Sequence, residues 1–227
     1  MMRTPVVRDL SDSAFDMHRI VWNAIAEWCG GGEYCPVETK ADISLAKDLD
    51  ILAGIDGFQK RPQRGVMRGI ASRIQWGDKA WNTFTLRKSR SSKVDTELKK
   101  RLWQLAHRHE GYLYPHITVQ AYITQRRVGD LLSVALAHTH ELIPYAYKAF
   151  ATLGVFERQN RFNHTGVWEQ TSRDEDGSWS TFLAVDWAKY EAAGCAIKQY
   201  HCDTQDVLGE PTPQFLEWVE EMEAMQV

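Results

Sequence analysis

Hydrophobic residues recur at helical spacing near both ends of the chain. In residues 11–29 they form one stripe, with Ser11 or Asp12 as the N-cap and Gly30 at the stop, so the pattern predicts a helix. Residues 211–225 predict an acidic C-terminal helix with Pro213 near its first turn.

A second amphipathic helix is predicted over residues 93–109. Its inward face carries Leu98, Leu102 and Leu105. On this pattern three consecutive basic residues face elsewhere: Lys99, Lys100 and Arg101.

Shorter apolar or alternating runs predict strands. They cover residues 50–58, 64–77, 82–88, 116–124, 181–186 and 196–201. Residues 128–150 are predicted to pass from strand to helix near Thr139, and a short helix capped by Gly194 follows the strand at 181–186. In the run at 82–88, Thr83, Thr85 and Arg87 alternate with apolar residues, which predicts one solvent-facing side.

This order of elements predicts a mixed α/β fold of the α+β kind, with a central mixed β-sheet flanked by helices. The 227 residues, 44% of them hydrophobic, suffice for one domain over residues 1–227. We expect its core at about residues 10–140 and a C-terminal strand–helix extension at 141–227.

Composition favours a reduced, cytoplasmic protein that does not enter a membrane. Apolar runs fall short of the ~18 residues that a membrane span needs, and the N-terminus lacks the apolar region of a secretory signal. The four cysteines form no C-x-x-C pair, so neither a redox motif nor a disulfide framework is predicted.

Charge is strongly segregated although the net charge is only −3. Residues 58–108 hold 14 Lys and Arg against three acids, whereas residues 203–223 hold seven acids and no Lys or Arg. A basic band of this kind predicts a polyanion site, with a solvated face as the plain alternative. The candidate nucleic-acid-binding residues are Arg64, Arg68, Arg87, Lys88, Arg90, Lys99 and Lys100.

Two acids, Asp50 and Asp56, bracket the apolar segment "DILAGID". Asp56 is hard to explain as a loop residue because the residues just before it are apolar. Carboxylates are the protein ligands that Mg²⁺ prefers, and a divalent ion can activate water for phosphodiester hydrolysis. A turn acid that bonds its own backbone is the alternative for Asp56.

The order of elements, "GID" at residues 54–56 and "GIASRIQW" at residues 69–76 resemble the PD-(D/E)xK, or restriction-endonuclease-like, superfamily over about residues 10–140. The combination "LAGID…GIASRIQ…NTFTLRK…TELKKR" is also similar to uncharacterised proteins of phages and mobile elements. The resemblance implies a nuclease-like protein that binds nucleic acid, most readily DNA, and uses Mg²⁺ or Mn²⁺. It points to Asp56, with Asp50 as a second acid, as metal ligands. The candidate catalytic residues are Asp56, Arg73 and Gln75, because strand alternation lets them converge on one face as a phosphate-binding site with weak metal capacity.

The family's acid-x-Lys motif would fall on Ala71-Ser72-Arg73, which departs from it. The acid is missing, and Arg replaces Lys. Arginine cannot shuttle a proton, but it can clamp phosphate through two hydrogen bonds. Arg73 and Gln75 share one face of the predicted strand. The alternative function is therefore a catalytically inactive nuclease-fold protein that acts by binding nucleic acid, or a phage-encoded interaction or inhibitor protein.

Other motifs are weaker candidates. Glu38 and Lys40 form an E-x-K without a suitable preceding Asp strand, and Glu97 is expected to pair with Arg101 at i+4. The histidines His107, His109, His138 and His140 suggest zinc without naming a third ligand, while His116 and Thr118 match half of a two-histidine phosphoesterase motif. Trp76 and Trp81 flank the basic strands and are candidates for stacking on bases.

Overall fold

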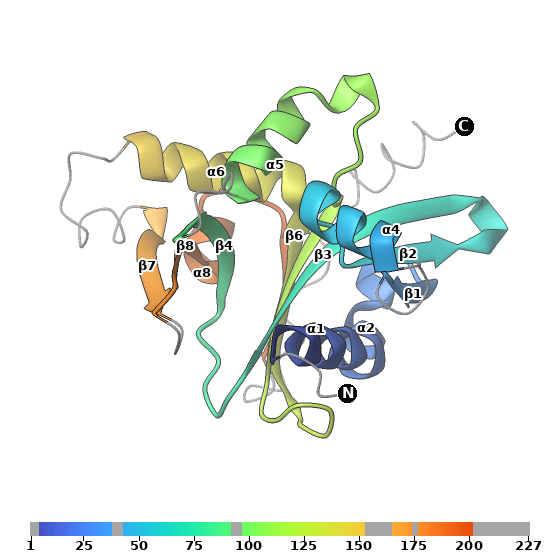
Figure 1. Cartoon of the computed structure of the whole chain (residues 1–227). Helices are drawn as coiled ribbons and strands as arrows, with labels where there is room; N and C mark the ends of the chain where they lie inside the picture. The colour runs from blue at the N-terminus through green and yellow to red at the C-terminus, as the bar shows by residue number, and fades with distance from the viewer. Residues whose placement is uncertain (1–4, 38–42, 92–96, 153–164, 174–176, 202–227) are drawn as a thin grey trace.

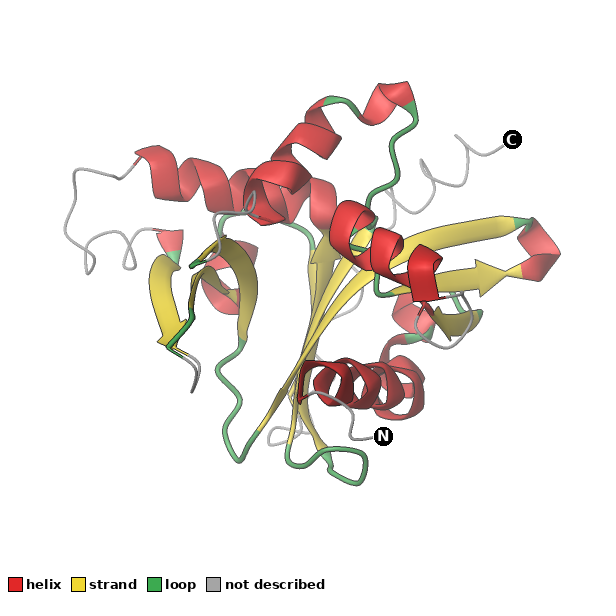
Figure 2. Ribbon diagram, viewed as in Figure 1, coloured by secondary structure: helices red, strands yellow, loops and turns green. Residues whose placement is uncertain are grey.

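The computed structural model of the chain describes residues 5–37, 43–91, 97–152, 165–173 and 177–201. Within them, two β-sheets and several helices build a mixed α+β fold, which confirms the predicted class (Figures 1 and 2). Glu38, Lys40 and the predicted C-terminal helix at 211–225 lie outside these residues. No described helix is both long and apolar enough to cross a membrane.

The larger sheet has six strands in the spatial order β1-β2-β3-β5-β6-β9. They are β1 (Glu33–Pro36), β2 (Gly57–Arg61), β3 (Val66–Trp76), β5 (Ile117–Ile123), β6 (Leu131–His138) and β9 (Ile197–His201). Among these described strands, only β3 and β5 pair in parallel, with Ile70 opposite Ile117, so the sheet is mixed as predicted. The predicted edge strand at 196–201 is confirmed as β9.

The smaller sheet has three antiparallel strands in the order β4-β8-β7. They are β4 (Thr83–Arg90), β8 (Trp179–Asp186) and β7 (Val167–Arg173). This sheet stands beside the larger one, on the side away from α1 (Figure 1). Neither β1 nor β7 was predicted; both carry polar and charged residues rather than a clear apolar alternation.

The N-terminal helical segment covers one face of the larger sheet. It runs through α1 (Pro5–Asp16), the π-helical turn η1 (Met17–Val21), α2 (Trp22–Ile25) and the 3₁₀ turn η2 (Glu27–Cys29). Met17, Val21 and Ile25 are fully buried against strand residues such as Val119 and Val134. The predicted end is correct, because Gly30 caps the segment with φ +76°. The predicted start is wrong: the helix begins at Pro5, a residue suited to a first turn, and Asp12 lies inside it.

The opposite face of the larger sheet is covered by three helices and the smaller sheet. The helices are α5 (Glu97–Ala106), α6 (Thr139–Thr152) and α8 (Trp187–Ala192), with a 3₁₀ turn η5 (Arg108–Glu110) after α5. Phe84 of β4 and Trp187 pack with Tyr122 in this second core. The predicted junction at Thr139 is confirmed, and Leu98 and Leu105 are buried as predicted.

The segment around Asp50 is not a strand. Helix α4 (Ile43–Asp48) continues into the π-helical turn η3 (Leu49–Ala53), which ends at Gly54 with φ +66°. The predicted strand at 50–58 is therefore wrong, because a short apolar run does not distinguish a buried helix from a strand. The strand β2 begins only at Gly57, and the 3₁₀ turn η4 (Pro62–Arg64) connects it to β3.

Candidate functional site

Asp56 lies just before β2, beside the strand that carries Arg73. Its Oδ2 accepts a hydrogen bond from the backbone N–H of Ser72 at 2.6 Å. Its own N–H donates to the carbonyl of Ile70 at 2.9 Å, one step beyond the last β2–β3 pair. These two bonds thus extend the β2–β3 pairing by one residue before β2 begins at Gly57. The expected position at the end of a strand is wrong; Asp56 precedes one.

Asp50 and Asp56 both interact electrostatically with Arg101, a buried residue of α5 with 4% exposure. The Nη1 of Arg101 donates to the carbonyl of Ala53 and to Oε1 of Gln104, the latter at 2.6 Å. The prediction that Arg101 faces away from the core is therefore wrong. Burial lowers the pKa of Arg101, and the charges of Glu97, Asp56 and Asp50 oppose that shift.

Burial raises the pKa of Asp50, and the charge of Glu97 raises it further. The guanidinium groups of Arg101 and Arg90 act in the opposite direction. These acids suit a divalent ion poorly, because one Asp56 oxygen is bound to Ser72 and a guanidinium lies among them. Among the described residues, no group of three or more His, Cys, Asp or Glu side chains is placed to hold a metal.

A polar layer separates the two sheets where β3 and β5 face β4. Buried Gln120 accepts from the backbone N–H of Thr85 at 3.3 Å and from its hydroxyl at 2.9 Å. The Nε2 of Gln120 donates to Oε1 of Gln75 at 3.2 Å. The prediction that this side of the strand faces solvent is therefore wrong for Thr83 and Thr85. Both residues are buried, and Tyr122 and Gln120 supply their hydrogen-bond partners.

Arg73 of β3 and Arg87 of β4 meet over one aromatic ring in this layer. The Cζ atom of Arg73 lies 4.9 Å from the centroid of the Phe182 ring, and that of Arg87 lies 5.6 Å from it. Both arginines are half-buried, and the Nε atom of Arg87 is buried without a hydrogen-bond partner. In the described part of the chain, neither guanidinium has a carboxylate partner.

This pair gathers positive charge without local compensation. Two guanidinium groups repel each other, more strongly when half-buried than in bulk water. An anion bound beside both groups would offset this repulsion, and it could accept from the Nε–H of Arg87, which is buried without a partner. Phosphate is the anion that such forked donors match best. Arg73 and Gln75 share one face as predicted, whereas the Asp56 carboxylate is bound to the backbone of β3 instead.

The other predicted basic residues have different environments. Arg68 is 8% exposed, and its guanidinium donates to Oε1 of Gln59 at 2.7 Å and to the carbonyl of Cys29. Lys88 pairs with Glu169 and lies 4.1 Å from the Phe150 ring centroid. Arg64 and Arg90 are exposed. Arg68 is thus withdrawn from the surface, a position that a charge count along the chain does not reveal.

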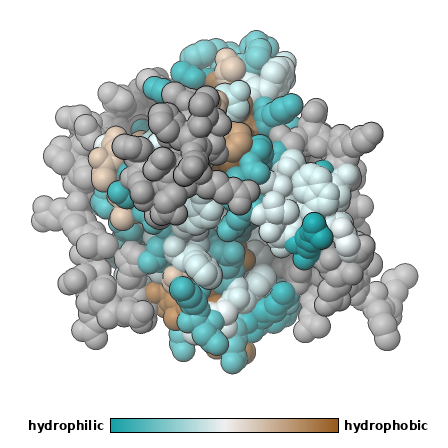
Figure 3. Space-filling view, turned by 90° about the vertical axis from the view of Figure 1, so that its left-hand side faces the viewer, coloured by the Kyte–Doolittle hydropathy of each residue, from teal (hydrophilic) through white to brown (hydrophobic). Residues whose placement is uncertain are grey.

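Two of the predicted basic residues, Lys99 and Lys100, line an open groove of about 830 Å³ between η3 and α5. Its wall includes five large apolar residues that are 44–60% exposed: Leu45, Leu52, Trp103, Tyr112 and Leu113. By contrast, the side of the molecule with the smaller sheet displays mostly hydrophilic or intermediate described residues (Figure 3). The groove is a distinct surface that sequence reasoning missed, because its apolar residues come from three separate segments.

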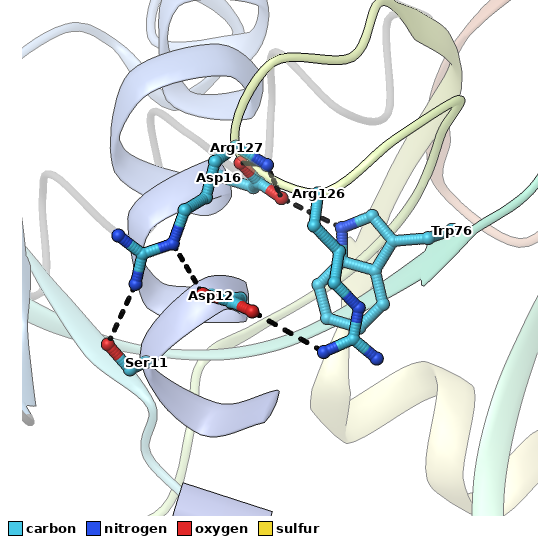
Figure 4. A network of polar contacts seen from close by, with 6 residues as sticks. All are labelled: Ser11, Asp12, Asp16, Trp76, Arg126 and Arg127. Carbon is cyan, nitrogen blue, oxygen red and sulfur yellow. Dashed lines mark hydrogen bonds and ion pairs between the residues drawn. The ribbon is translucent and has the colours of Figure 1, made fainter. Parts of the chain in front are cut away.

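Trp76 does not offer a free face for a base. Its Nε1 donates to Asp16 at 2.8 Å, and Arg126 lies 4.2 Å from its ring centroid (Figure 4). Arg126 and Arg127 also bind Asp12, which explains why that acid is buried inside α1. Trp81 is 61% exposed, and the Nζ of Lys79 lies 4.1 Å from its ring centroid, so its candidate role in stacking stays a prediction.

The histidines form two separate groups. His107 stacks on Trp103 with ring centroids 4.4 Å apart, beyond the end of α5. His138 and His140 stack at 5.5 Å, where β6 enters α6. Burial lowers the pKa of His138 to about 3, and the charges of His140 and Arg68 act in the same direction.

The half-motif of His116 and Thr118 lies next to this second group. Ile117 pairs with His138, and the hydroxyls of Thr118 and Thr139 are 2.9 Å apart. Burial also lowers the pKa of His116. Low pKa values favour neutral imidazoles, which do not attract phosphate as cations do, so this group is a weaker anion site than the arginine pair.

No protein-family model, curated protein or solved structure matches the chain in the three comparisons.

Proposed function

We propose that this protein binds nucleic acid and that Arg73 and Arg87 hold a backbone phosphate between them. The observation that carries the proposal is the convergence of these two arginines on Phe182 without a carboxylate partner among the described residues. The buried Nε of Arg87 also lacks a hydrogen-bond partner, and buried polar atoms are normally satisfied. An unpaired couple therefore favours a ligand of opposite charge.

The surroundings of the pair favour a planar, two-point contact. Cation–π contact with Phe182 fixes the plane of each guanidinium and lowers the entropy lost when a ligand binds. The hydrogen-bonded Gln75 and Gln120 hold the neighbouring polar layer in place. Exposed Arg64 and Arg90 add long-range attraction for a polyanion. DNA is the partner that the resemblance implies, and phosphate contacts of this kind carry no base specificity.

A metal-dependent phosphodiesterase is the second candidate. It is favoured by the hydrogen bond from Ser72 to Asp56, because this bond brings the two motif elements of the PD-(D/E)xK resemblance together. In that version Asp56, with Asp50, would hold Mg²⁺ or Mn²⁺, and the ion would polarise the phosphate and activate water. Ala71 still lacks the acid that the motif calls for, so the binding function is the stronger proposal.

The test of binding is a salt titration with fluorescent single-stranded and duplex DNA, read by anisotropy. Wild-type affinity should fall with salt, and Arg73→Gln with Arg87→Gln should reduce the log–log slope for duplex by about 0.9 if one phosphate contact is lost. Lys79→Gln is the matched control, since Lys79 is also a cation over an aromatic ring. An unchanged slope in the double variant, or affinity that ignores salt, would refute the proposal.

A further inference from the structure

The connection between β3 and β4 displays the most exposed tryptophan among the described residues. It comprises residues 77–82, and Trp81 within it is 61% exposed. The Nζ of Lys79 lies 4.1 Å from the centroid of the indole ring. The connection joins the two strands that carry Arg73 and Arg87, and it lies at the end of the fold away from α5 and α6 (Figure 1). An exposed ring therefore stands on the chain segment that links the two arginines.

The backbone on both sides of Trp81 is held by the rest of the fold. The N–H of Gly77 donates to a backbone carbonyl of β5 at 3.0 Å. The carbonyl of Asn82 accepts from the N–H of Trp187 at 3.0 Å, and its side-chain Oδ1 accepts from the hydroxyl of Ser133 at 2.9 Å. Asn82 has φ +50°, a conformation that asparagine tolerates and that these contacts select. A ring displayed from anchored ends loses less entropy when a ligand binds.

This connection offers a ligand stacking rather than charge. The charges of Asp78 and Lys79 cancel, so the segment adds little long-range attraction to that of the arginine pair. Lys79 lies over one face of the Trp81 ring, and the residue remains exposed all the same, which leaves contact area for a second planar group. Nucleobases stack on such rings whatever their identity, because every base has a π-face. A ligand that combines planar groups with phosphate is a nucleotide chain.

Only an unpaired base can use Trp81 in this way. In a duplex each base is stacked between its neighbours, whereas the bases of a single strand can be splayed out onto aromatic side chains. A flexible strand also turns a phosphate toward the half-buried guanidinium groups of Arg73 and Arg87 more easily than a stiff duplex does. The ring and the arginine pair thus favour the same form of nucleic acid.

The spacing of the two features suits one strand. Trp81 precedes Arg87 by six residues, most of them in the extended strand β4, so the two lie at most about 20 Å apart at ~3.4 Å per residue. A stacked strand of nucleic acid rises ~3.4 Å per nucleotide, so this distance corresponds to about five or six nucleotides. Folds that bind single strands contact about 4–16 nucleotides, which includes this length.

We propose that the protein binds single-stranded nucleic acid, with a phosphate on Arg73 and Arg87 and a base of the same strand stacked on Trp81. This binding mode rests on the proposed function and narrows its ligand to unpaired nucleic acid. The stacking contact adds affinity without adding charge, so its loss and the loss of the arginine pair have different signatures.

The test is fluorescence anisotropy with a labelled thymidine oligomer of about 12 nucleotides and a labelled duplex of about 30 base pairs. Trp81→Ala should weaken oligomer binding about five- to hundredfold and leave duplex affinity within about twofold. The salt slope should stay unchanged, because no cation is lost. Trp81→Phe should keep most of the affinity, since a ring remains. Trp103→Ala is the matched control: Trp103 of α5 is 50% exposed and also carries a stacked group, His107, and its loss should change neither affinity.

Photo-cross-linking locates the stacked base directly. The same oligomer with 5-iodouracil in place of single thymines should attach to Trp81 under ultraviolet light, and mass spectrometry of the peptides identifies the site. Trp103 should acquire no label. Arg73→Gln with Arg87→Gln should lower the yield at Trp81, because the strand is then held at one point only. Circular dichroism of each variant checks that it is folded.

The possible failures point to different causes. Unchanged oligomer affinity in Trp81→Ala, together with weak binding by the double arginine variant, would overturn the single-strand contact and leave the proposed function in place. Equal losses for oligomer and duplex in Trp81→Ala, or a wild type that binds only the duplex, would also overturn it. A double arginine variant that binds both ligands as the wild type does would refute the phosphate site, and with it the shared strand.

Discussion

A Cβ atom on Gly54 would overlap the guanidinium of Arg101, so the buried arginine occupies space that any other residue at position 54 would fill. Gly54 also has φ +66°, a backbone conformation that residues with a Cβ atom rarely adopt. The sequence "AGID" thus combines the end of a helical turn with room for a cation from α5. The acids on either side, Asp50 and Asp56, are the charges that this cation interacts with.

Gly54→Ala should destabilise the protein by roughly 3–5 kcal/mol, because displacing Arg101 leaves buried charges without their partner. Gly65→Ala is the matched control: Gly65 has φ +65°, but nothing lies within 4 Å of its added Cβ. The control should lose only about 1 kcal/mol from backbone strain. Urea unfolding followed by tryptophan fluorescence measures both. Equal losses in the two variants would contradict the role of Arg101.

Arg68 and Arg64 should behave oppositely although they lie on the same hairpin. Arg68→Ala removes the donors to Gln59 and Cys29 and should cost about 3 kcal/mol or more, as the loss of a buried charged partner does. Arg64→Ala should leave thermal stability unchanged and weaken DNA binding modestly in a salt-dependent way. Calorimetry measures the thermal stability of both variants, and anisotropy measures their DNA binding. An Arg68→Ala protein as stable as the wild type would mean that this arginine is not part of the core.

The sequence predicted the fold best where periodicity was long and regular. The α5 leucines and the junction at Thr139 were located correctly because each hydrophobic pattern is compatible with only one type of secondary structure. The segment at 50–58 failed because its apolar run is too short to distinguish a π-helical turn from a strand. Of the candidate site, Arg73 and Gln75 were assigned to one face by strand alternation. Their meeting with Arg87 and Phe182 depends on how two sheets pack, which spacing along the chain does not encode.

Arg73→Lys should weaken nucleic-acid binding by about five- to thirtyfold, because lysine loses the two-point contact and the planar stacking on Phe182. Arg87→Lys should act similarly. If Arg73 instead replaces a catalytic lysine, the same change should preserve or raise cleavage, and Ala71→Glu should increase Mn²⁺ affinity measured by calorimetry. Anisotropy on Arg73→Lys with circular dichroism as the folding control separates the two roles by the sign of the change.

Stability should depend on His138 between about pH 6.5 and pH 3. Its pKa is lowered to about 3 in the folded protein, chiefly by burial, so the unfolded state binds the proton first as the pH falls. The contribution is fully present above pH 6.5 and is lost toward pH 3, by up to about 1.4 kcal/mol per pH unit. His116 and His140 act in the same direction.

His138→Gln removes that titration. The difference in unfolding free energy between wild type and variant should stay constant from pH 7 to 8 and should shrink or reverse as the pH falls from 6.5 to 4. Chemical denaturation at each pH provides the values. A difference that is flat across the acidic range would mean that His138 accepts a proton in the folded state as readily as in the unfolded one.

Two substitutions of Asp56 distinguish a structural role of this residue from a catalytic one. Asp56→Asn keeps an oxygen that can accept from Ser72, so it should cost less than about 1 kcal/mol of stability. Asp56→Ala leaves that N–H without its acceptor and should cost about 1–3 kcal/mol. If Asp56 also holds a divalent ion, both variants should lose Mg²⁺- or Mn²⁺-dependent DNA cleavage, since an amide is a far weaker ligand than a carboxylate. Gel assays measure cleavage and urea melts measure stability for the wild type and both variants. Cleavage that survives in Asp56→Asn would show that Asp56 takes no part in the reaction. Wild-type protein that cleaves neither DNA nor RNA with either metal would leave binding as the function.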